Sequence, residues 1–175
     1  TIVIGHKKEQ ILEEIRRNPI QGQRTTFVEN PRFDVDTNIL SLIKGVQDVD
    51  QSVYVFEGDL LLKDEMVREI AHEKWRDKSV WFTHKDFVTG MSGGILKQEN
   101  GKVVEVDIVP EFKTNYHEGF KKLIGIMHIH QSQLSLYKKF LSENSKKTTR
   151  QYYLNSWFEN LDALPSFWGD LSFSE

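Results

Sequence analysis

The order of apolar and polar positions predicts that strands and helices alternate along the first half of the chain. Short runs rich in β-branched and aromatic residues predict strands at residues 1–4, 24–29, 52–57 and 79–83. Apolar residues at helical spacing between these runs predict helices at residues 6–17, 36–46 and 65–76. This alternation predicts a Rossmann-like sheet that is mostly parallel and flanked by helices.

The second half of the chain has a different character. Asn100-Gly101 between two apolar runs predicts a β-hairpin over residues 94–108, because Asn-Gly fits the two-residue turns of hairpins. Further patterns predict a strand at 122–129, helices at 133–143 and 151–161, a polar loop at 145–149 and a final edge strand at 167–173. We therefore expect an α/β fold with a mixed or antiparallel second half.

The run from Ser52 to Phe56 is the stretch around which we expect the sheet to be organised. It has no polar alternation, which is typical of a central parallel strand covered on both faces. Glu57-Gly58-Asp59 follows directly. Ligands of open α/β sheets bind outside the carboxyl ends of the strands, and Mg²⁺ prefers carboxylate oxygen, so Asp59 is a candidate metal ligand. The alternative is a turn whose acidic side chains are simply solvated.

The composition is that of a globular chain. It has 175 residues, of which 38% are hydrophobic and 28% are charged, enough for one domain with a sizeable core. The net charge of −3 argues against a general role in binding nucleic acid or membrane surfaces. Cysteine is absent, and no apolar run is long enough to cross a bilayer. We therefore expect a cytoplasmic protein.

The two ends of the sequence predict that the domain is incomplete. The chain begins at Thr1, within a predicted strand and without a methionine, and it ends at Glu175 close to another predicted strand. We expect residues 1–175 to form a single domain that is cut at both ends.

Several short segments resemble the nucleotidyltransferase family with the GT-A-like fold. In chain order they are Val3 to Ile11, Asn30-Pro31, Thr37 to Leu42, Val53 to Asp59 and Gly125-Ile126. Their order and spacing are closest to the branch that contains phosphocholine cytidylyltransferases and sugar-phosphate nucleotidyltransferases. Two parts of the family pattern, a glycine-rich phosphate loop and a second metal-binding Asp, have no counterpart in the sequence.

The resemblance implies transfer of a nucleoside monophosphate from a nucleoside triphosphate, with CTP favoured, to a phosphorylated acceptor such as phosphocholine or a sugar phosphate. Pyrophosphate would be released, and Mg²⁺ bound by the catalytic Asp59 would neutralise the phosphates. Glu57 would support this site electrostatically or point into the sheet. The resemblance implies that Asn38, Ser41 and Gly58 contact the nucleotide. We expect residues 1–83 to hold the nucleotide and residues 84–175 to hold the acceptor.

The candidate binding residues also have structural alternatives. Asn38 fits the N-cap of a helix, and Ser41 fits packing of the same helix. Tyr153, Trp157 and Trp81 could form an aromatic cage for a quaternary ammonium acceptor. Aromatic residues at helical spacing are more often part of a core, which is the alternative for all three.

Three functions stay open, and the transferase is the first of them. The second is a non-catalytic nucleotide-binding or regulatory domain of the same fold. The third is a glycosyltransferase, which ranks last because Glu57-Gly58-Asp59 is a poor match to an Asp-x-Asp metal motif. His128 and His130 share one face of a strand but lack a third ligand, so we expect packing or surface roles for them. A homo-oligomer is also kept open.

Overall fold

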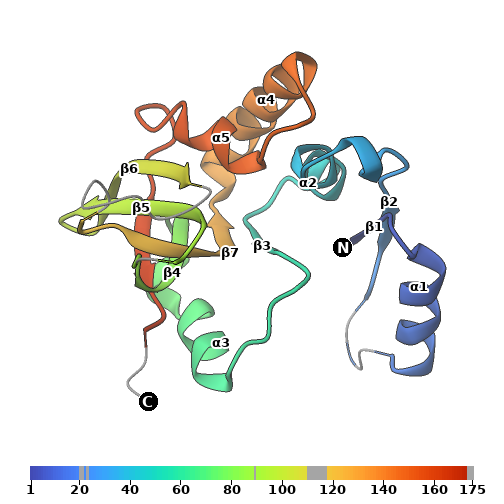
Figure 1. Ribbon diagram of the computed structural model, residues 1–175. Helices are drawn as coiled ribbons and strands as arrows, with labels where there is room; N and C mark the ends of the chain where they lie inside the picture. The colour runs from blue at the N-terminus through green and yellow to red at the C-terminus, as the bar shows by residue number, and fades with distance from the viewer. Residues whose placement is uncertain (20–21, 23, 89, 110–117, 173–175) are drawn as a thin grey trace. The chain divides into compact units, whose positions relative to one another are not determined.

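The computed structural model describes residues 1–19, 22, 24–88, 90–109 and 118–172 (Figure 1). The chain divides into two compact units. The first unit consists of Thr1–Val49 and Ser135–Glu159, and the second of Asp50–Leu134 and Asn160–Glu175. These boundaries differ from the expected halves, 1–83 and 84–175. The assignment of nucleotide and acceptor to those halves stays a prediction.

The first unit begins with a strand-helix-strand arrangement, as the alternating pattern predicts. Strands β1 (Ile2–Ile4) and β2 (Phe27–Glu29) pair in parallel, and helix α1 (Lys8–Arg17) connects them (Figure 1). A 3-10 turn, η1 (Phe33–Val35), leads into helix α2 (Ile39–Val46). The apolar residues of α2 recur every three or four positions, so one face of the helix is buried.

Two later helices complete the first unit. Helix α4 (Gln131–Lys147) supplies its residues from Ser135 onward, and α5 (Tyr153–Phe158) follows. Tyr137 of α4 is fully buried, its hydroxyl donates to the carbonyl of Tyr153 at 2.9 Å, and its ring packs edge-on against Trp157. Burial raises the pKa of Tyr137 well above its ordinary value, so this hydroxyl keeps its proton and remains a donor.

Helix α4 extends beyond its predicted end at residue 143, so the predicted polar loop is wrong for residues 145–147. Polar contacts within the unit hold these last turns. The Asn144 amide donates to the Ser156 hydroxyl at 3.2 Å and to the Glu159 carboxylate at 2.9 Å, and Lys147 donates to the Asn144 side-chain oxygen at 2.9 Å. Such contacts with distant residues leave no mark in the local apolar pattern.

The second unit is built on a six-stranded sheet. Its strands are β3 (Val53–Phe56), β4 (Val80–Asp86), β5 (Gly93–Glu99), β6 (Lys102–Val109), β7 (Lys121–Ile129) and β8 (Phe167–Asp170). They are ordered β3-β7-β4-β8-β6-β5, and β5 also pairs with β7. Strands β4 and β8 pair in parallel, whereas the other pairs of this sheet are antiparallel. The expectation of a mostly parallel sheet is therefore wrong for this unit.

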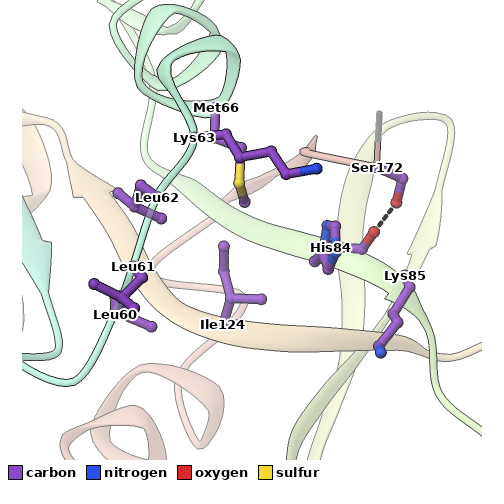
Figure 2. Close-up of a pocket in the computed structure, with 9 residues that line it drawn as sticks. All are labelled: Leu60, Leu61, Leu62, Lys63, Met66, His84, Lys85, Ile124 and Ser172. Atoms are coloured by element: carbon purple, nitrogen blue, oxygen red, sulfur yellow. Dashed lines mark hydrogen bonds between the residues drawn. The ribbon is translucent and has the colours of Figure 1, made fainter. Parts of the chain in front are cut away.

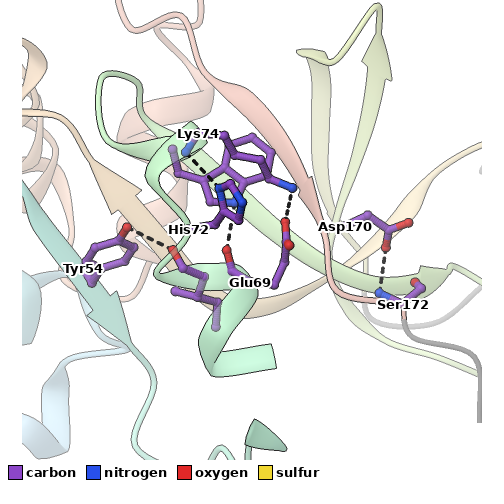
Figure 3. Close-up of polar contacts among 8 residues, drawn as sticks. Tyr54, Glu69, His72, Lys74, Asp170 and Ser172 are labelled. Carbon is purple, nitrogen blue, oxygen red and sulfur yellow. Dashed lines mark hydrogen bonds and ion pairs between the residues drawn. The ribbon is translucent and has the colours of Figure 1, made fainter. Parts of the chain in front are cut away.

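The strand expected at the centre lies at the edge of the described sheet. β3 pairs with β7 alone among the described strands, and the pairing is antiparallel. Tyr54 is 37% exposed and Phe56 is 49% exposed. The Tyr54 ring stacks on His128 with centroids 4.4 Å apart. Its hydroxyl donates to the carbonyl of Ile70 at 3.0 Å, the dashed line at Tyr54 in Figure 3. The aromatic residues of this run therefore make contacts on an outer face instead of being buried on both faces.

The predicted hairpin is confirmed. Strands β5 and β6 pair on either side of Asn100 and Gly101, whose φ angles of 52° and 78° are both left-handed, as a two-residue hairpin turn requires. Strand β8 lies between β4 and β6, so its predicted place at an edge is wrong. The predicted end of that strand, Phe173, lies outside the described residues.

Helix α3 (Asp64–Ile70) packs its apolar face into the core of the second unit. Met66 and Ile70 are buried there with Val80, Phe82, Ile126 and Leu171. The helix is shorter than predicted, and a 3-10 turn, η2 (Glu73–Trp75), follows it. The His72 ring accepts from the backbone N–H of Lys74 at 3.1 Å, which caps this turn (Figure 3).

Within the described parts of the chain, no helix combines the length and the apolar character that a membrane crossing requires. The expected cytoplasmic location stays a prediction.

Candidate functional site

Asp59 lies in the turn that follows β3. Its side chain is exposed, and it forms no ion pair with any residue that the structure describes. Gly58 precedes it in open surroundings, since a Cβ there would meet no atom within 4 Å. This position agrees with the solvated turn kept as the alternative, and it also fits one ligand of a hard cation whose other ligands are waters and phosphate oxygens. Metal binding by Asp59 stays a prediction.

Glu57 is turned onto the sheet, which is one of the two orientations expected for it. Its backbone N–H donates to the carbonyl of Gly125 at 2.9 Å and continues the β3–β7 ladder by one residue. A Cβ built on Gly125 would lie 2.4 Å from Oε2 of Glu57, and the φ of Gly125 is +73°. Position 125 therefore favours glycine for its backbone angle, and any larger residue there would displace the Glu57 carboxylate.

Lys122, at the start of β7, lies close enough to Glu57 for their charges to interact. Burial lowers the pKa of Lys122, and the negative charge of Glu57 partly opposes this effect. The Lys122 ammonium nitrogen lies 3.5 Å from the carbonyl oxygen of Gly94. A Cβ built on Gly93 would lie 2.8 Å from the same nitrogen. The two charged side chains and three glycines therefore pack closely around this end of β7.

A pocket of about 450 Å³ begins at the residue after Asp59 (Figure 2). Leu60, Leu62 and Ile124 form apolar walls and pack against the core under α3, where Met66 also lines the pocket. Leu61 lies at its rim and is 99% exposed. The volume is in the range of small-molecule sites.

The basic side of the pocket comes from the end of β4. His84 and Lys85 follow the fully buried stretch Val80 to Thr83, so they lie where the strand leaves the core. The backbone around β8 fixes this side. Nδ1 of His84 lies 3.2 Å from the carbonyl oxygen of Leu171, and the Ser172 hydroxyl donates to the carbonyl of His84 (Figure 2). Lys63, from the loop before α3, supplies a second amine.

In the first unit, Asn38 occupies the N-cap position of α2 but does not cap it with its side chain. Its Oδ1 accepts from the backbone N–H of Tyr153 at 2.9 Å, which ties α2 to the start of α5. The helix is capped by Asp36, whose Oδ1 accepts from the N–H of Leu40 at 3.0 Å. The N-cap alternative for Asn38 therefore holds only for its backbone position.

Ser41 belongs to a compact hydrogen-bond network with two polar neighbours. Its N–H and its hydroxyl both donate to Oδ2 of Asp36, each at 3.0 Å. The same hydroxyl accepts from the amide of Asn30 at 3.0 Å, and Asn30 is only 1% exposed. Packing of α2 thus accounts for Ser41, and its contact with a nucleotide stays a prediction.

The three aromatic residues expected in an acceptor cage are buried. Tyr153 and Trp157 lie in the first unit at 3% and 0% exposure, and Trp81 lies in β4 of the second unit at 1% exposure. Trp157 packs on Tyr137, and Tyr153 accepts the hydrogen bond from that residue. These positions match the core alternative. Gly58, Asp59 and Trp81 belong to the second unit, whereas Asn38 and Ser41 belong to the first.

The described residues contain no group of three or more His, Cys, Asp or Glu side chains that could hold a metal ion. His128 is 3% exposed, and its Nδ1 lies 2.9 Å from the carbonyl oxygen of Lys78. Burial lowers the pKa of His128. His130 instead contacts the Ser132 hydroxyl at 2.8 Å. The packing role expected for His128 is confirmed.

Comparison with solved structures identifies the fold. The CTP:phosphocholine cytidylyltransferase from Streptococcus pneumoniae matches with a TM-score of 0.71 at 15% identity, over 98% of this chain and 68% of that protein. The inositol-1-phosphate CTP transferase from T. maritima matches with a TM-score of 0.64 at 13% identity, over 97% of this chain and 65% of that protein. A UDP-glucose pyrophosphorylase matches with a TM-score of 0.63 at 12% identity, over 98% of this chain and 72% of that protein.

This chain has the nucleotidyltransferase fold. The resemblance found in the sequence is thereby confirmed at the level of the fold. No family model matches the sequence, and comparison with curated proteins gives no match either. The chain spans about two thirds of the length of the matched structures (68%, 65% and 72%).

The pocket was missed in the sequence because its lining comes from four separate segments. One local signal was available: His84 and Lys85 follow four consecutive buried positions at the end of a predicted strand. Polar residues just past such a strand end are common site residues in α/β folds.

Proposed function

We propose that this chain belongs to an enzyme that transfers a nucleoside monophosphate from a nucleoside triphosphate to a phosphorylated small acceptor. The observation that carries the proposal is the exposed Asp59 in the turn after β3, in a chain with the nucleotidyltransferase fold. An oxygen of the acceptor phosphate would attack the α-phosphorus. The bond between that phosphorus and the bridging oxygen of pyrophosphate would break, and pyrophosphate would leave.

We also propose Mg²⁺ as the cofactor, with Asp59 as its protein ligand. In proteins Mg²⁺ commonly binds through one or two carboxylates together with substrate phosphates and water, and Asp59 with a triphosphate would supply such a set. The ion would offset the negative charge of the phosphates. Glu57 would act by position, because its contacts with Gly125 hold the beginning of the turn that carries Asp59.

Among the triphosphates we favour CTP, and among the acceptors phosphocholine or a sugar phosphate. CTP is named for two of the compared enzymes, one with phosphocholine and one with inositol 1-phosphate. The sequence resemblance supports nucleotide contacts by Asn38, Ser41 and Gly58. Asn38 and Ser41 already hold hydrogen bonds within the first unit, so a nucleotide would have to share these groups or use their remaining lone pairs and protons.

The test is Mg²⁺-dependent release of pyrophosphate by the whole protein that contains this chain. CTP, UTP, ATP, GTP and dTTP would each be supplied with phosphocholine or glucose 1-phosphate. We expect Asp59→Asn to reduce turnover about 100-fold or more, because it removes a charge from the site of phosphate neutralisation. Asp77→Asn, an equally exposed carboxylate of the second unit, is the matched control and should retain activity. Full activity of Asp59→Asn would remove this residue from the proposed site.

A non-catalytic nucleotide-binding domain of the same fold is the second candidate. Its support is that the hydrogen bonds of Asn38 and Ser41 and the exposed Asp59 would serve binding of a nucleotide as well as its turnover. Calorimetric titration with CTP and Mg²⁺ separates the two candidates. Binding of a triphosphate without pyrophosphate release, for every acceptor supplied, would support the non-catalytic domain and contradict the transferase.

A further inference from the structure

The pocket beside Asp59 has an apolar floor. Leu60, Leu62 and Ile124 are partly buried against the core of the second unit, and Met66 closes the floor at 8% exposure. A fully polar ligand would leave the pocket-facing surface of these side chains without an apolar contact. A ligand with an apolar body would remove their remaining surface from water, which is favourable.

The opposite side of the pocket is basic. Lys63, His84 and Lys85 line it, and Figure 2 shows the Lys63 side chain extending toward the side formed by His84 and Ser172. The Lys85 side chain extends in the other direction in the same view, so Lys63 and His84 are the side chains that face this part of the pocket, and their nitrogens favour an anion.

These amines differ from other lysines of the same unit. Lys121 pairs with Asp86, and Lys74 pairs with Glu69. Lys63 and Lys85 pair with no carboxylate within the part of the chain that the structure describes.

Two carboxylates lie next to Lys63 along the chain, Asp64 and Glu65. Both are exposed in the first turn of α3, where negative charge complements the positive end of the helix dipole. The carboxylate next to Lys85 along the chain belongs to Asp86, which forms an ion pair with Lys121. The charge at the pocket mouth is therefore not cancelled by a direct ion pair.

We propose that this pocket binds a small phosphate monoester with an apolar body. The phosphate would lie between Lys63 and His84, with Lys85 at the margin of the pocket, and the apolar body would lie on Leu60, Leu62 and Ile124. This site requires only binding and does not depend on nucleotidyl transfer by Asp59. Its ligand could be the transfer acceptor or an effector, because both would present the same chemistry to the pocket.

The probe for this site is phenyl phosphate, with phenol and inorganic phosphate as its two separate halves. Calorimetric titration of the whole protein at low salt should show phenyl phosphate binding at least tenfold more tightly than either half. The double variant Lys63→Gln/Lys85→Gln should weaken phenyl phosphate at least tenfold and leave phenol unchanged. The matched control is Lys102→Gln/Lys146→Gln, which removes two equally exposed lysines and should bind like the unmodified protein.

Two results would overturn the proposal: phenol binding as tightly as phenyl phosphate, or equal loss of affinity in the pocket variant and its control. The comparison of the three probes needs no variant, so it decides the matter even if a substitution impairs folding. Phosphorus NMR after addition of CTP and Mg²⁺ then shows whether the bound ligand is a transfer acceptor or an effector. A new diphosphate-linked product identifies an acceptor, and unchanged phenyl phosphate that still binds identifies an effector. The second result would count against transfer to this ligand and would leave the binding site intact.

Discussion

The carboxylate of Glu57 occupies the space that a side chain at Gly125 would need. A Cβ at position 125 would lie 2.4 Å from Oε2 of Glu57, and the left-handed φ of +73° already disfavours any other residue. The same pair is joined through the backbone, since the Glu57 N–H donates to the Gly125 carbonyl at 2.9 Å. A glycine of β7 therefore fixes the end of β3, from which the turn with Asp59 begins.

We expect Gly125→Ala to lower the free energy of unfolding by about 2–4 kcal/mol, as the sum of left-handed strain and overpacking. Gly119→Ala is the matched control, because Gly119 also has a left-handed φ (+79°) but a Cβ there would meet no atom within 4 Å. We expect this variant to lower the free energy of unfolding by only about 1–2 kcal/mol. Urea denaturation measures both. Adding Glu57→Ala to Gly125→Ala should restore part of the loss. Equal losses at the two glycines would mean that Glu57 gives way without cost.

Asp36 should contribute more to the stability of α2 than its position before the helix suggests. Its carboxylate accepts from the backbone of Leu40 and Ser41 and from the Ser41 hydroxyl, each at 3.0 Å. We expect Asp36→Ala to lower the free energy of unfolding by about 1–2 kcal/mol, as for other lost caps. Asp34→Ala, two residues earlier and exposed, should stay within about 0.5 kcal/mol. Thermal unfolding of both variants checks this, and similar losses would contradict the capping role.

Stability should fall as the pH is lowered through the ordinary pKa of histidine, about 6.5. Burial lowers the pKa of His128 in the folded state, so below pH 6.5 the unfolded chain takes up a proton that the folded chain resists. The contribution of His128 to the free energy of unfolding is fully present above pH 6.5. It is lost as the pH falls toward the lower pKa that His128 has in the folded state, and the free energy of unfolding then changes by at most about 1.4 kcal/mol per pH unit. Urea unfolding at pH 7.5 and 5.5 measures it. His128→Gln should flatten the dependence, and an unchanged slope would assign it to other groups.

Local chemistry explains which elements could be predicted from the sequence. The hairpin is correct because Asn100 and Gly101 can both adopt the left-handed angles that its turn needs. The prediction of β1-α1-β2 is correct because apolar residues recur every three or four positions in the helix and form short continuous runs in the strands. The position of β3 is wrong because an apolar run does not say which strand pairs with it. Tyr54 and Phe56 look like core residues in sequence, and the contacts of Tyr54 with His128 and Ile70 become visible only in three dimensions.

The candidate site was predictable to a similar extent. A carboxylate at a strand end suggested Asp59, and the structure gives it an exposed position in a turn. The pocket could not be predicted, since Ile124, His84 and Ser172 come from different strands or their ends. The burial of Tyr153, Trp157 and Trp81 agrees with the core alternative kept for them, and their contact with an acceptor stays a prediction.

The loop from Gly58 to Lys63 lies between two fixed elements. Before it, the N–H of Glu57 donates to the Gly125 carbonyl of β7, and after it Met66 of α3 is buried in the core of the second unit. The Tyr54 hydroxyl also joins β3 to Ile70, the last residue of α3 (Figure 3). Asp59 and the wall of the pocket are therefore parts of one short tethered segment. A cation that immobilised this segment at Asp59 would reduce the entropy still to be lost when the pocket is filled, and a molecule in the pocket would do the same for the cation. Occupancy of the two positions would then be thermodynamically linked, with each ligand tightening the other by the same factor.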